Sequence, residues 1–413
     1  MANALINPTV IAKEALMQLK NELRFAKLAH REYKEEFVKV GNTVNIRKPV
    51  KFYTADGATR VNQDVEEANT SIVIDKRKHV SWKFSTQDLT LTVEKYSERY
   101  IKPAMITLAQ TIDLGGASLY NKVWNCVGAP GTVPGNYADV AQATQRLTEM
   151  AVPNSERASV MNSASFHKIA ATLTTLNMPQ EAHKAWTSGE IGNVAGFRTF
   201  ESVNLRTHTV GPLGGTPLVN GGSQGSAYSA VKNTYTQDLV TDGWTAAAAA
   251  RLKAGDVFTI AGCYAVNPVP GEGTTGKNVM PYLQQFVVQS DVSSDGSGNA
   301  TISISPPIIA SGPYQTVSAV PADNAAITVL GTASTGYTQN LCFHKNAFAL
   351  VTVPLELPDG AAFKAREESE GISLRVIKDY DIDTDDDVVR IDVLYGWKAI
   401  YPDLASRLIG AVA

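Results

Sequence analysis

Apolar residues near the start of the chain recur at spacings of three and four. They are Ile11, Ala15, Leu19, Leu23 and Ala26, and charged residues stand between them over residues 8–33. Positions spaced in this way share one face of a helix. The pattern therefore predicts an amphipathic N-terminal helix, and it does not decide whether that helix packs on its own domain or serves a partner.

Short apolar or alternating segments follow at residues 44–47, 72–74 and 80–84, and they are typical of strands. The stretch between the first two is charged and has little to bury, with a turn signal at Asp56-Gly57. Its charged residues are Lys48, Lys51, Arg60, Asp64, Glu66 and Glu67. We expect a protruding hairpin here, because long charged excursions in compact proteins usually serve a function; a plain surface loop is the alternative.

Helical spacing returns at residues 93–124 and holds for about eight turns, which would give a rod of roughly 45 Å. Pro103 and the Gly115-Gly116 pair fall inside this stretch, and each is expected to bend or divide the helix. The next region predicts a small α/β domain, with helices at 139–150 and 163–173 and a strand at 158–161.

At about Gly211 the composition shifts to Gly, Ser, Thr and Ala, which indicates a separate domain. Segments 256–260, 286–288 and 301–304 are short strands bounded by turn residues, as in a small β-barrel or sandwich. Strand patterns resume at 347–353 and 374–393. An insertion into one domain explains this order better than a linear string of domains.

The composition of the chain argues against several classes of protein. The 413 residues are 44% hydrophobic, enough to build cores without disulfides, and the net charge of -3 argues against a dedicated nucleic-acid binder. The three cysteines, Cys126, Cys263 and Cys342, are far apart and indicate buried thiols in a reducing compartment. The N-terminus shows no secretion signal, and no stretch is apolar enough to cross a bilayer, so we expect a cytoplasmic protein with no membrane partner.

Two motifs suggest chemistry, and both are weak. Residues 271–277 nearly fit a phosphate-binding loop, but Asn278 replaces the required Ser or Thr, and Pro281 prevents a following helix. Asp381, Asp383, Asp385 and Asp387 alternate as in a calcium loop, but the required glycine is absent, so we expect an acidic turn between strands. No catalytic constellation was found, and we expect no catalytic residue, metal or cofactor.

The order of elements resembles the Hong Kong 97-type major capsid proteins of tailed phages, and most of all the coat proteins of Salmonella short-tailed phages, which carry an inserted domain. The matching segments are residues 41–44 and 49–50, 194–197, 252–256 and 260–262, and 394–397 with Pro402. None is specific alone, and their collinearity carries the resemblance.

The resemblance implies an α+β capsid fold with six parts. These are an N-terminal arm (1–47), an extended hairpin loop (48–72), a peripheral domain with a spine helix (73–135), the first part of an axial domain (136–212), an inserted β-barrel (213–338) and closing strands of the axial and peripheral domains (339–413). The family's inserted domain projects an acidic loop toward neighbouring capsomers. That loop would fall near residues 237–244, shortened here to Asp238 and Asp242.

The implied function is assembly of hexamers and pentamers into an icosahedral head that encloses double-stranded DNA, through a scaffolded precursor shell that expands. Inter-subunit contacts would involve the charged hairpin residues together with Asp381, Asp383 and Asp385, and scaffolding protein would bind Glu14 and Glu22. A portal protein, a decoration protein and non-specific contact with packaged DNA complete the expected partners, and the capsid would assemble in the host cytoplasm. A cellular nanocompartment shell is the alternative, and a nucleotide-binding enzyme using Lys277 is a remote one.

Overall fold

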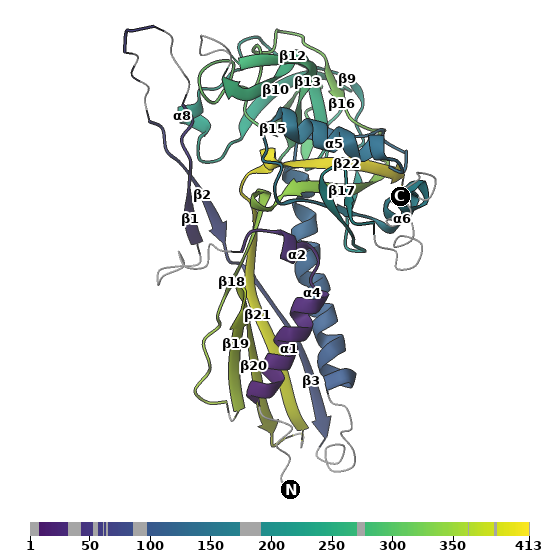
Figure 1. The fold of residues 1–413 in the computed structure, drawn as a ribbon. Helices are drawn as coiled ribbons and strands as arrows, with labels where there is room; N and C mark the ends of the chain where they lie inside the picture. The colour runs from purple at the N-terminus through teal and green to yellow at the C-terminus, as the bar shows by residue number, and fades with distance from the viewer. Residues whose placement is uncertain are drawn as a thin grey trace. The chain divides into compact units, whose positions relative to one another are not determined.

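The computed structural model describes residues 8–31, 43–52, 57–60, 62, 65–85, 97–173, 191–270, 277–361, 363–383 and 386–412. The chain forms two compact units, each assembled from segments distant in sequence (Figure 1). The first contains residues 1–45, 71–117 and 348–399, and the second contains residues 46–70, 118–347 and 400–413. No helix in the described part of the chain is both long and apolar enough to cross a membrane.

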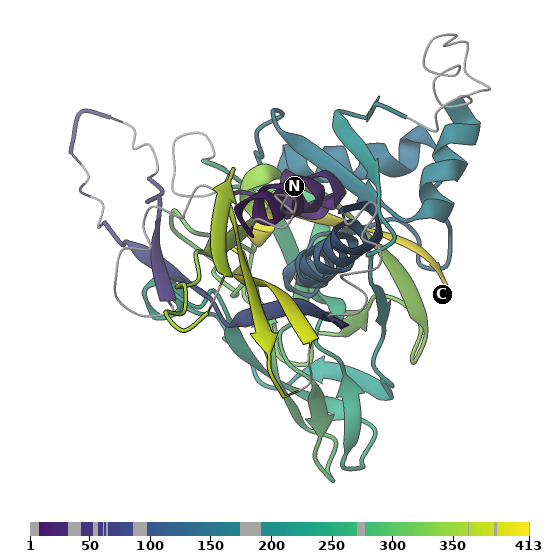
Figure 2. The same cartoon turned by 90° about the horizontal axis from the view of Figure 1, so that it is seen from below.

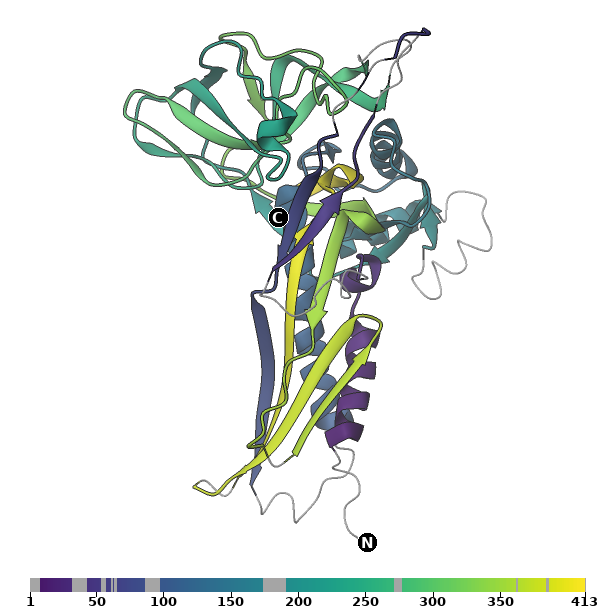
Figure 3. The same ribbon diagram turned by 90° about the vertical axis from the view of Figure 1, so that its left-hand side faces the viewer.

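The first unit is built on a five-stranded antiparallel sheet (Figure 3). Strand β21 (Asp386–Ala399) is its longest member and pairs with β3 (Lys76–Ser85) along ten residues. On its other side it pairs first with β20 (Ile372–Asp381) and then with β18 (Phe348–Val353), while β19 (Phe363–Ser369) pairs with β20. β21 therefore pairs directly with three of the other strands, and β19 joins the sheet through β20.

Two helices pack side by side in this unit, α1 (Pro8–Glu22) and α4 (Lys102–Ala117) (Figure 2). α1 also lies against β19 and β20. Ile11, Ala15 and Leu19, which the spacing predicted, are almost fully enclosed, and Ala12 and Leu16 on the same face are buried as well. The amphipathic character of the N-terminal helix is thus confirmed.

The predicted extent of both helices was wrong. The N-terminal helix stops at Glu22, and a separate short helix α2 (Phe25–Leu28) follows. The spine is a regular α-helix only over Lys102–Ala117, with a π-helical turn before it (Ser97–Ile101) and a 3-10 turn after it (Ser118–Lys122). Pro103 near its start and the glycine pair near its end mark these boundaries, as their backbone preferences require.

Gly116 has a packing role beyond its backbone freedom. A Cβ atom there would lie 2.4 Å from the Phe25 ring and 2.8 Å from the Trp397 ring. Phe25 and Trp397 contact each other with ring centroids 5.7 Å apart, and Trp397 Nε1–H donates to the Ile112 carbonyl at 3.0 Å. The glycine therefore lets an aromatic cluster reach the helix backbone.

The second unit contains a seven-stranded mixed sheet. Its strands are β4 (Cys126–Val127), β5 (Arg157–Met161), β6 (Asn193–Val194), β7 (Phe197–Glu201), β8 (Thr207–Thr209), β17 (Gly336–His344) and β22 (Ala405–Val412). Helices α5 (Tyr137–Glu149) and α6 (Ser163–Leu173) share a buried apolar cluster with this sheet. The strand and both helices predicted here are confirmed. All three cysteines are buried and free, as predicted.

A six-stranded antiparallel sheet occupies residues 215–329 of the same unit. In spatial order its strands are β16 (Ile327–Val329), β12 (Val257–Pro270), β13 (Lys277–Val288), β15 (Ala300–Ser305), β10 (Gln237–Trp244) and β9 (Gly215–Val219). A β-bridge from Leu218 to Ala326 links the two end strands, so the sheet closes on itself around a separate apolar core. β11 (Ala249–Leu252) and β14 (Val292–Ser294) form a small pair beside it.

A buried polar network joins the two sheets of this unit where the chain passes between them. His208 Nε2 and Asp256 Oδ1 are 2.7 Å apart, and Asp256 Oδ2 accepts the N–H groups of Gly211 and Lys253. His208 Nδ1 lies 3.1 Å from the Tyr120 hydroxyl. Because a buried carboxylate needs several partners, these bonds fix the start of the second sheet against the first.

Candidate functional site

The charged hairpin begins after β1 (Thr43–Lys48) and ends in β2 (Ala68–Val73), and the two strands pair. We call residues 48–67, from the last residue of β1 to the residue before β2, the extended loop. Arg60 is exposed, Glu67 forms an exposed ion pair with Arg47 at 3.6 Å, and Asp64 lies outside the described residues. The loop also exposes two apolar side chains, Phe52 (58%) and Val65 (62%). Exposed apolar and charged groups together are typical of a contact surface.

The base of the extended loop contacts the closed sheet within the second unit. Lys48 Nζ lies 5.4 Å from the centre of the Tyr235 ring and 5.9 Å from that of Tyr401. The backbone N–H of Lys51 donates to the Tyr314 hydroxyl at 3.0 Å. The Tyr314 hydroxyl in turn donates to the Glu66 carbonyl at 3.4 Å. Of the predicted contact residues, Lys48 is therefore engaged inside its own chain through its side chain, and Lys51 and Glu66 through their backbone.

Lys277, the lysine of the phosphate-loop-like motif, is the first residue of β13, and residues 271–276 lie outside the described part. It is followed by a strand rather than a helix, which supports rejection of that motif. Its Nζ donates to the Gln315 carbonyl at 3.3 Å. Burial, together with the neighbouring Lys51 ammonium, lowers the pKa of Lys277 to about 8.

We expect Lys277→Gln to stabilise the unassembled chain at pH 7. The pKa of Lys277 is about 8 in the folded chain, against an ordinary value of 10.5. Burial of its charge therefore destabilises the fold fully below pH 8, and this destabilisation decreases as the pH rises toward 10.5. The variant should therefore melt about 2–4 °C higher at pH 7, and the gain should shrink as pH rises from 8 to 10. Calorimetry across this range measures it, with Lys253→Gln at an exposed turn as the control; a gain independent of pH would contradict the assignment.

The acidic run forms the turn between β20 and β21, as predicted. Asp381 ends β20 and accepts the N–H of Asp383 at 3.1 Å, and both residues are exposed. Asp385 lies outside the described residues. Basic neighbours neutralise the strand that follows: Lys83 bonds Asp386 at 2.7 Å, and Lys378 pairs with Asp387 at 3.3 Å. No metal-binding cluster of His, Cys, Asp or Glu occurs among the described residues.

The two glutamates proposed for scaffold contact lie on α1, and both are half-buried. Glu14 accepts a hydrogen bond from Gln18 Nε2 at 3.0 Å. The outer face of the helix also exposes Lys13, Val10 (54%) and Met17 (49%). This apolar pair, seven residues apart and so on one face, was missed in the sequence, although its spacing could have indicated it.

Asp238 and Asp242 do not lie on a projecting loop, so that expectation was wrong. Residues Gln237–Trp244 form strand β10, which pairs with β15 on one side and β9 on the other. Leu239, Thr241 and Trp244 point inward and are buried, while Asp238 is exposed. The nearly alternating pattern required a strand, because a loop would have left Leu239 and Trp244 in water.

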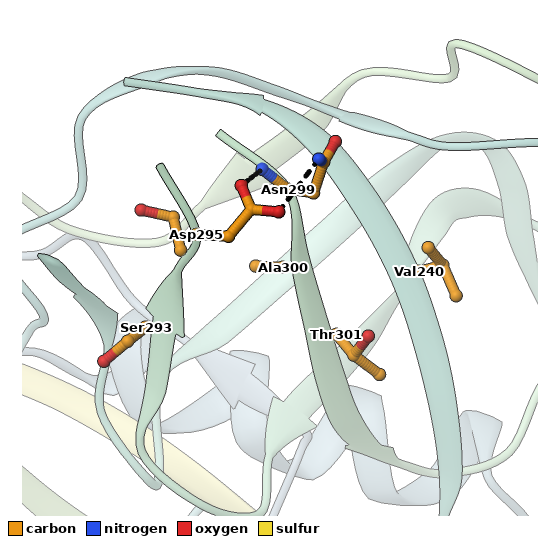
Figure 4. Close-up of a pocket in the computed structure, with 7 residues that line it drawn as sticks. Val240, Ser293, Asp295, Asn299, Ala300 and Thr301 are labelled. Atoms are coloured by element: carbon orange, nitrogen blue, oxygen red, sulfur yellow. Dashed lines mark hydrogen bonds between the residues drawn. The ribbon is translucent and has the colours of Figure 1, made fainter. Parts of the chain in front are cut away.

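A hollow of about 410 Å³ lies beside β10 (Figure 4). Val240, Asp295, Asn299 and Thr301 are among its lining residues. The Asp295 carboxylate is already occupied, because its oxygens accept the N–H groups of Ser297 and Asn299 and the Asn299 side-chain amide. The carboxylate therefore holds its own turn together.

Comparison with known proteins identifies the chain. A family model described as P22 coat protein, gene protein 5, matches residues 1–410. The chain belongs to the P22 coat protein family. A major capsid protein from Acyrthosiphon pisum secondary endosymbiont phage 1 is 26% identical over 290 residues, covering 69% of this chain and 68% of that protein.

Solved structures of phage proteins are also similar. One from Mycobacterium phage Che8 has 17% identity and a TM-score of 0.48, covering 93% of this chain and 90% of its own. One from the capsid of cyanophage P-SCSP1u has 12% identity and a TM-score of 0.42, covering 90% and 84%. As a member of the coat protein family, this chain is a phage major capsid protein, a structural α+β subunit of the virion capsid that self-associates and not an enzyme.

Proposed function

We propose that this coat protein has the Hong Kong 97-type architecture and tiles an icosahedral shell as hexamers and pentamers around double-stranded DNA. In this proposal residues 1–47 are the N-terminal arm, 48–72 the extended hairpin loop and 213–338 the inserted β-barrel. Residues 73–135 belong to the peripheral domain and residues 136–212 to the axial domain, and the strands at 339–413 close both domains. The closed sheet at 215–329, with its own apolar core, supports the boundaries of the inserted domain.

The extended loop is the proposed contact with a neighbouring copy. The observation that supports it is the joint exposure of Phe52, Arg60 and Val65 on one loop of a family whose members assemble. Burying two apolar side chains would favour docking, and the charge would set the register of the contact. The many identical contacts of a closed shell allow each one to be weak. The acidic turn at Asp381, Asp383 and Asp385 is a second proposed contact.

We expect Arg60→Glu to impair shell assembly without changing the stability of the subunit. Reversing an exposed charge leaves the fold intact but reverses the charge pairing that the loop is proposed to make with its neighbour. The yield of closed shells in electron micrographs should fall about tenfold or more, since each 1.4 kcal/mol per contact is a factor of ten. Arg60→Lys is the matched control, and normal shells from Arg60→Glu would count against the loop contact.

Assembly is proposed to pass through a precursor shell that expands, with lattice contacts rearranging while the domains stay folded. In this scheme Glu14 and Glu22 face a basic helix of a scaffolding protein, and the exposed Val10 and Met17 add apolar area to that contact. Portal protein, a decoration protein and packaged DNA are the other proposed partners, with assembly in the host cytoplasm. Glu14→Lys should release scaffold from precursor shells in sedimentation; full retention would exclude this role.

A further inference from the structure

One patch of the closed sheet faces both arms of the extended loop. It consists of helix α8 (Tyr228–Val231), Asn233, Tyr235 and Tyr314, and we call it the tyrosine clasp. Figures 1 and 3 show the two arms rising beside this part of the second unit. The outgoing arm is the chain at residues 48–52, and the returning arm is the chain at residues 65–69. The patch contacts the outgoing arm at Lys48 and Lys51 and the returning arm at Glu66 and Asn69.

Tyr314 bridges the two arms with a single hydroxyl. It accepts the N–H of Lys51 at 3.0 Å and donates to the Glu66 carbonyl at 3.4 Å. A phenol can do both at once because it has one proton and free lone pairs. Three residues beyond Glu66, the N–H of Asn69 donates to Asn233 Oδ1 at 3.1 Å. The separation of the arms is therefore set by side chains from segments that connect the strands of the closed sheet.

The bridging hydroxyl is itself held in place. The Tyr314 ring stacks on Tyr228 with centroids 3.5 Å apart and planes 4° from parallel. Burial and the neighbouring Tyr314 raise the pKa of Tyr228, so its hydroxyl stays neutral at any physiological pH. On the outgoing arm, the Lys48 ammonium lies over the Tyr235 ring, where the negative face of the ring attracts it.

The clasp leaves one strong acceptor unused. Glu66 is half-buried, and its Oε2 is enclosed with no hydrogen-bond partner among the described residues. A buried carboxylate oxygen without a partner is unfavourable until a donor reaches it.

We propose that the tyrosine clasp presets the extended loop of the unassembled subunit for docking on a second copy of this chain. The inference rests on the proposed function, in which that loop contacts its neighbour. Its physical basis is preorganisation: a loop already ordered at its base loses less conformational freedom on docking. The inserted domain would thus act on assembly through the loop of its own chain.

Hydrogen–deuterium exchange of the unassembled chain tests the clasp directly. Tyr314→Phe keeps the stacked ring and removes only the bridging hydroxyl, so the Lys51 amide should exchange about fivefold faster, the effect of losing one typical hydrogen bond. Tyr264→Phe, at a half-exposed tyrosine of β12, is the matched control and should leave Lys51 unchanged. Unchanged exchange of Lys51 in Tyr314→Phe would overturn the clasp.

The kinetics of shell assembly test whether the clasp presets the loop for docking. Tyr314→Phe should raise the protein concentration needed for shell formation about fivefold, in proportion to the lost preorganisation. Faster exchange with unaltered assembly would overturn the presetting role and leave the loop contact standing. Failure of the proposed function is distinguishable, because Arg60→Glu would then assemble normally, whereas the exchange of Lys51 is measured in the subunit before any assembly.

Discussion

Replacing Asp392 by alanine is expected to lower the free energy of unfolding of the unassembled chain by about 3–5 kcal/mol. The carboxylate is fully buried on the central strand β21 and meets three arginines. Arg375 lies 2.5 Å away on β20, Arg390 2.8 Å away on the same strand and Arg77 3.5 Å away on β3. Since Arg375 is itself buried, removing its partner would leave an uncompensated charge in the sheet.

Urea unfolding followed by circular dichroism measures this effect. The control is Asp359→Ala, which removes an exposed carboxylate paired with Lys364 at 3.5 Å and should change stability little. Burial alone would raise the pKa of Asp392, but the hydrogen bonds from Arg375 and Arg390 hold it below the ordinary 3.8. The stabilisation is therefore complete above pH 3.8 and is lost as pH falls through the lowered pKa. Equal losses in both variants at pH 7 would refute the assignment.

Sequence reasoning succeeded where structure depends on near neighbours. The strand Arg157–Met161 and the helix Ser163–Leu173 were predicted within a residue, because their apolar period and flanking turns are local signals. The acidic turn after Asp381 followed from the same kind of evidence. It failed at Gln237–Trp244, where a family resemblance was given more weight than the local alternation of buried residues.

The candidate contact surface was only partly predictable. The charge of the extended loop is visible in the sequence, and so is its lack of apolar residues to bury. Its anchoring is not, because Lys51 and Tyr314 are 263 residues apart and no local pattern relates them. The buried Arg375–Asp392 pair was hidden in the same way, since it depends on the register of two strands.

The break in the N-terminal helix has a cause equally distant in sequence. Asp113 of α4 is buried, and its carboxylate accepts three consecutive backbone N–H groups: Arg24 at 2.6 Å, Phe25 at 3.1 Å and Ala26 at 3.0 Å. These are the amides at the start of α2, which have no partner within that helix. The apolar spacing continued through this point, so only the fold reveals that a side chain 89 residues away supplies the cap.

Asp113→Ala is accordingly expected to lower the free energy of unfolding by about 3 kcal/mol, because at least two buried amides, those of Phe25 and Ala26, lose their acceptor. The loss should be local. Amides of residues 23–29 should exchange faster with deuterium, because α2 is held by Asp113 at its start, while amides of the closed sheet at 215–329 should not change.

Thr111→Ala on the same helix is the control, since its hydroxyl donates to the exposed Thr107 carbonyl one turn earlier. Burial raises the pKa of Asp113 even though the three amides oppose the change, so burial disfavours the charged form while the hydrogen bonds favour it. Asp113→Asn, which retains one carbonyl acceptor, should therefore recover part of the lost stability. If asparagine behaved no better than alanine, the charge and not the cap would be what anchors α2 to α4.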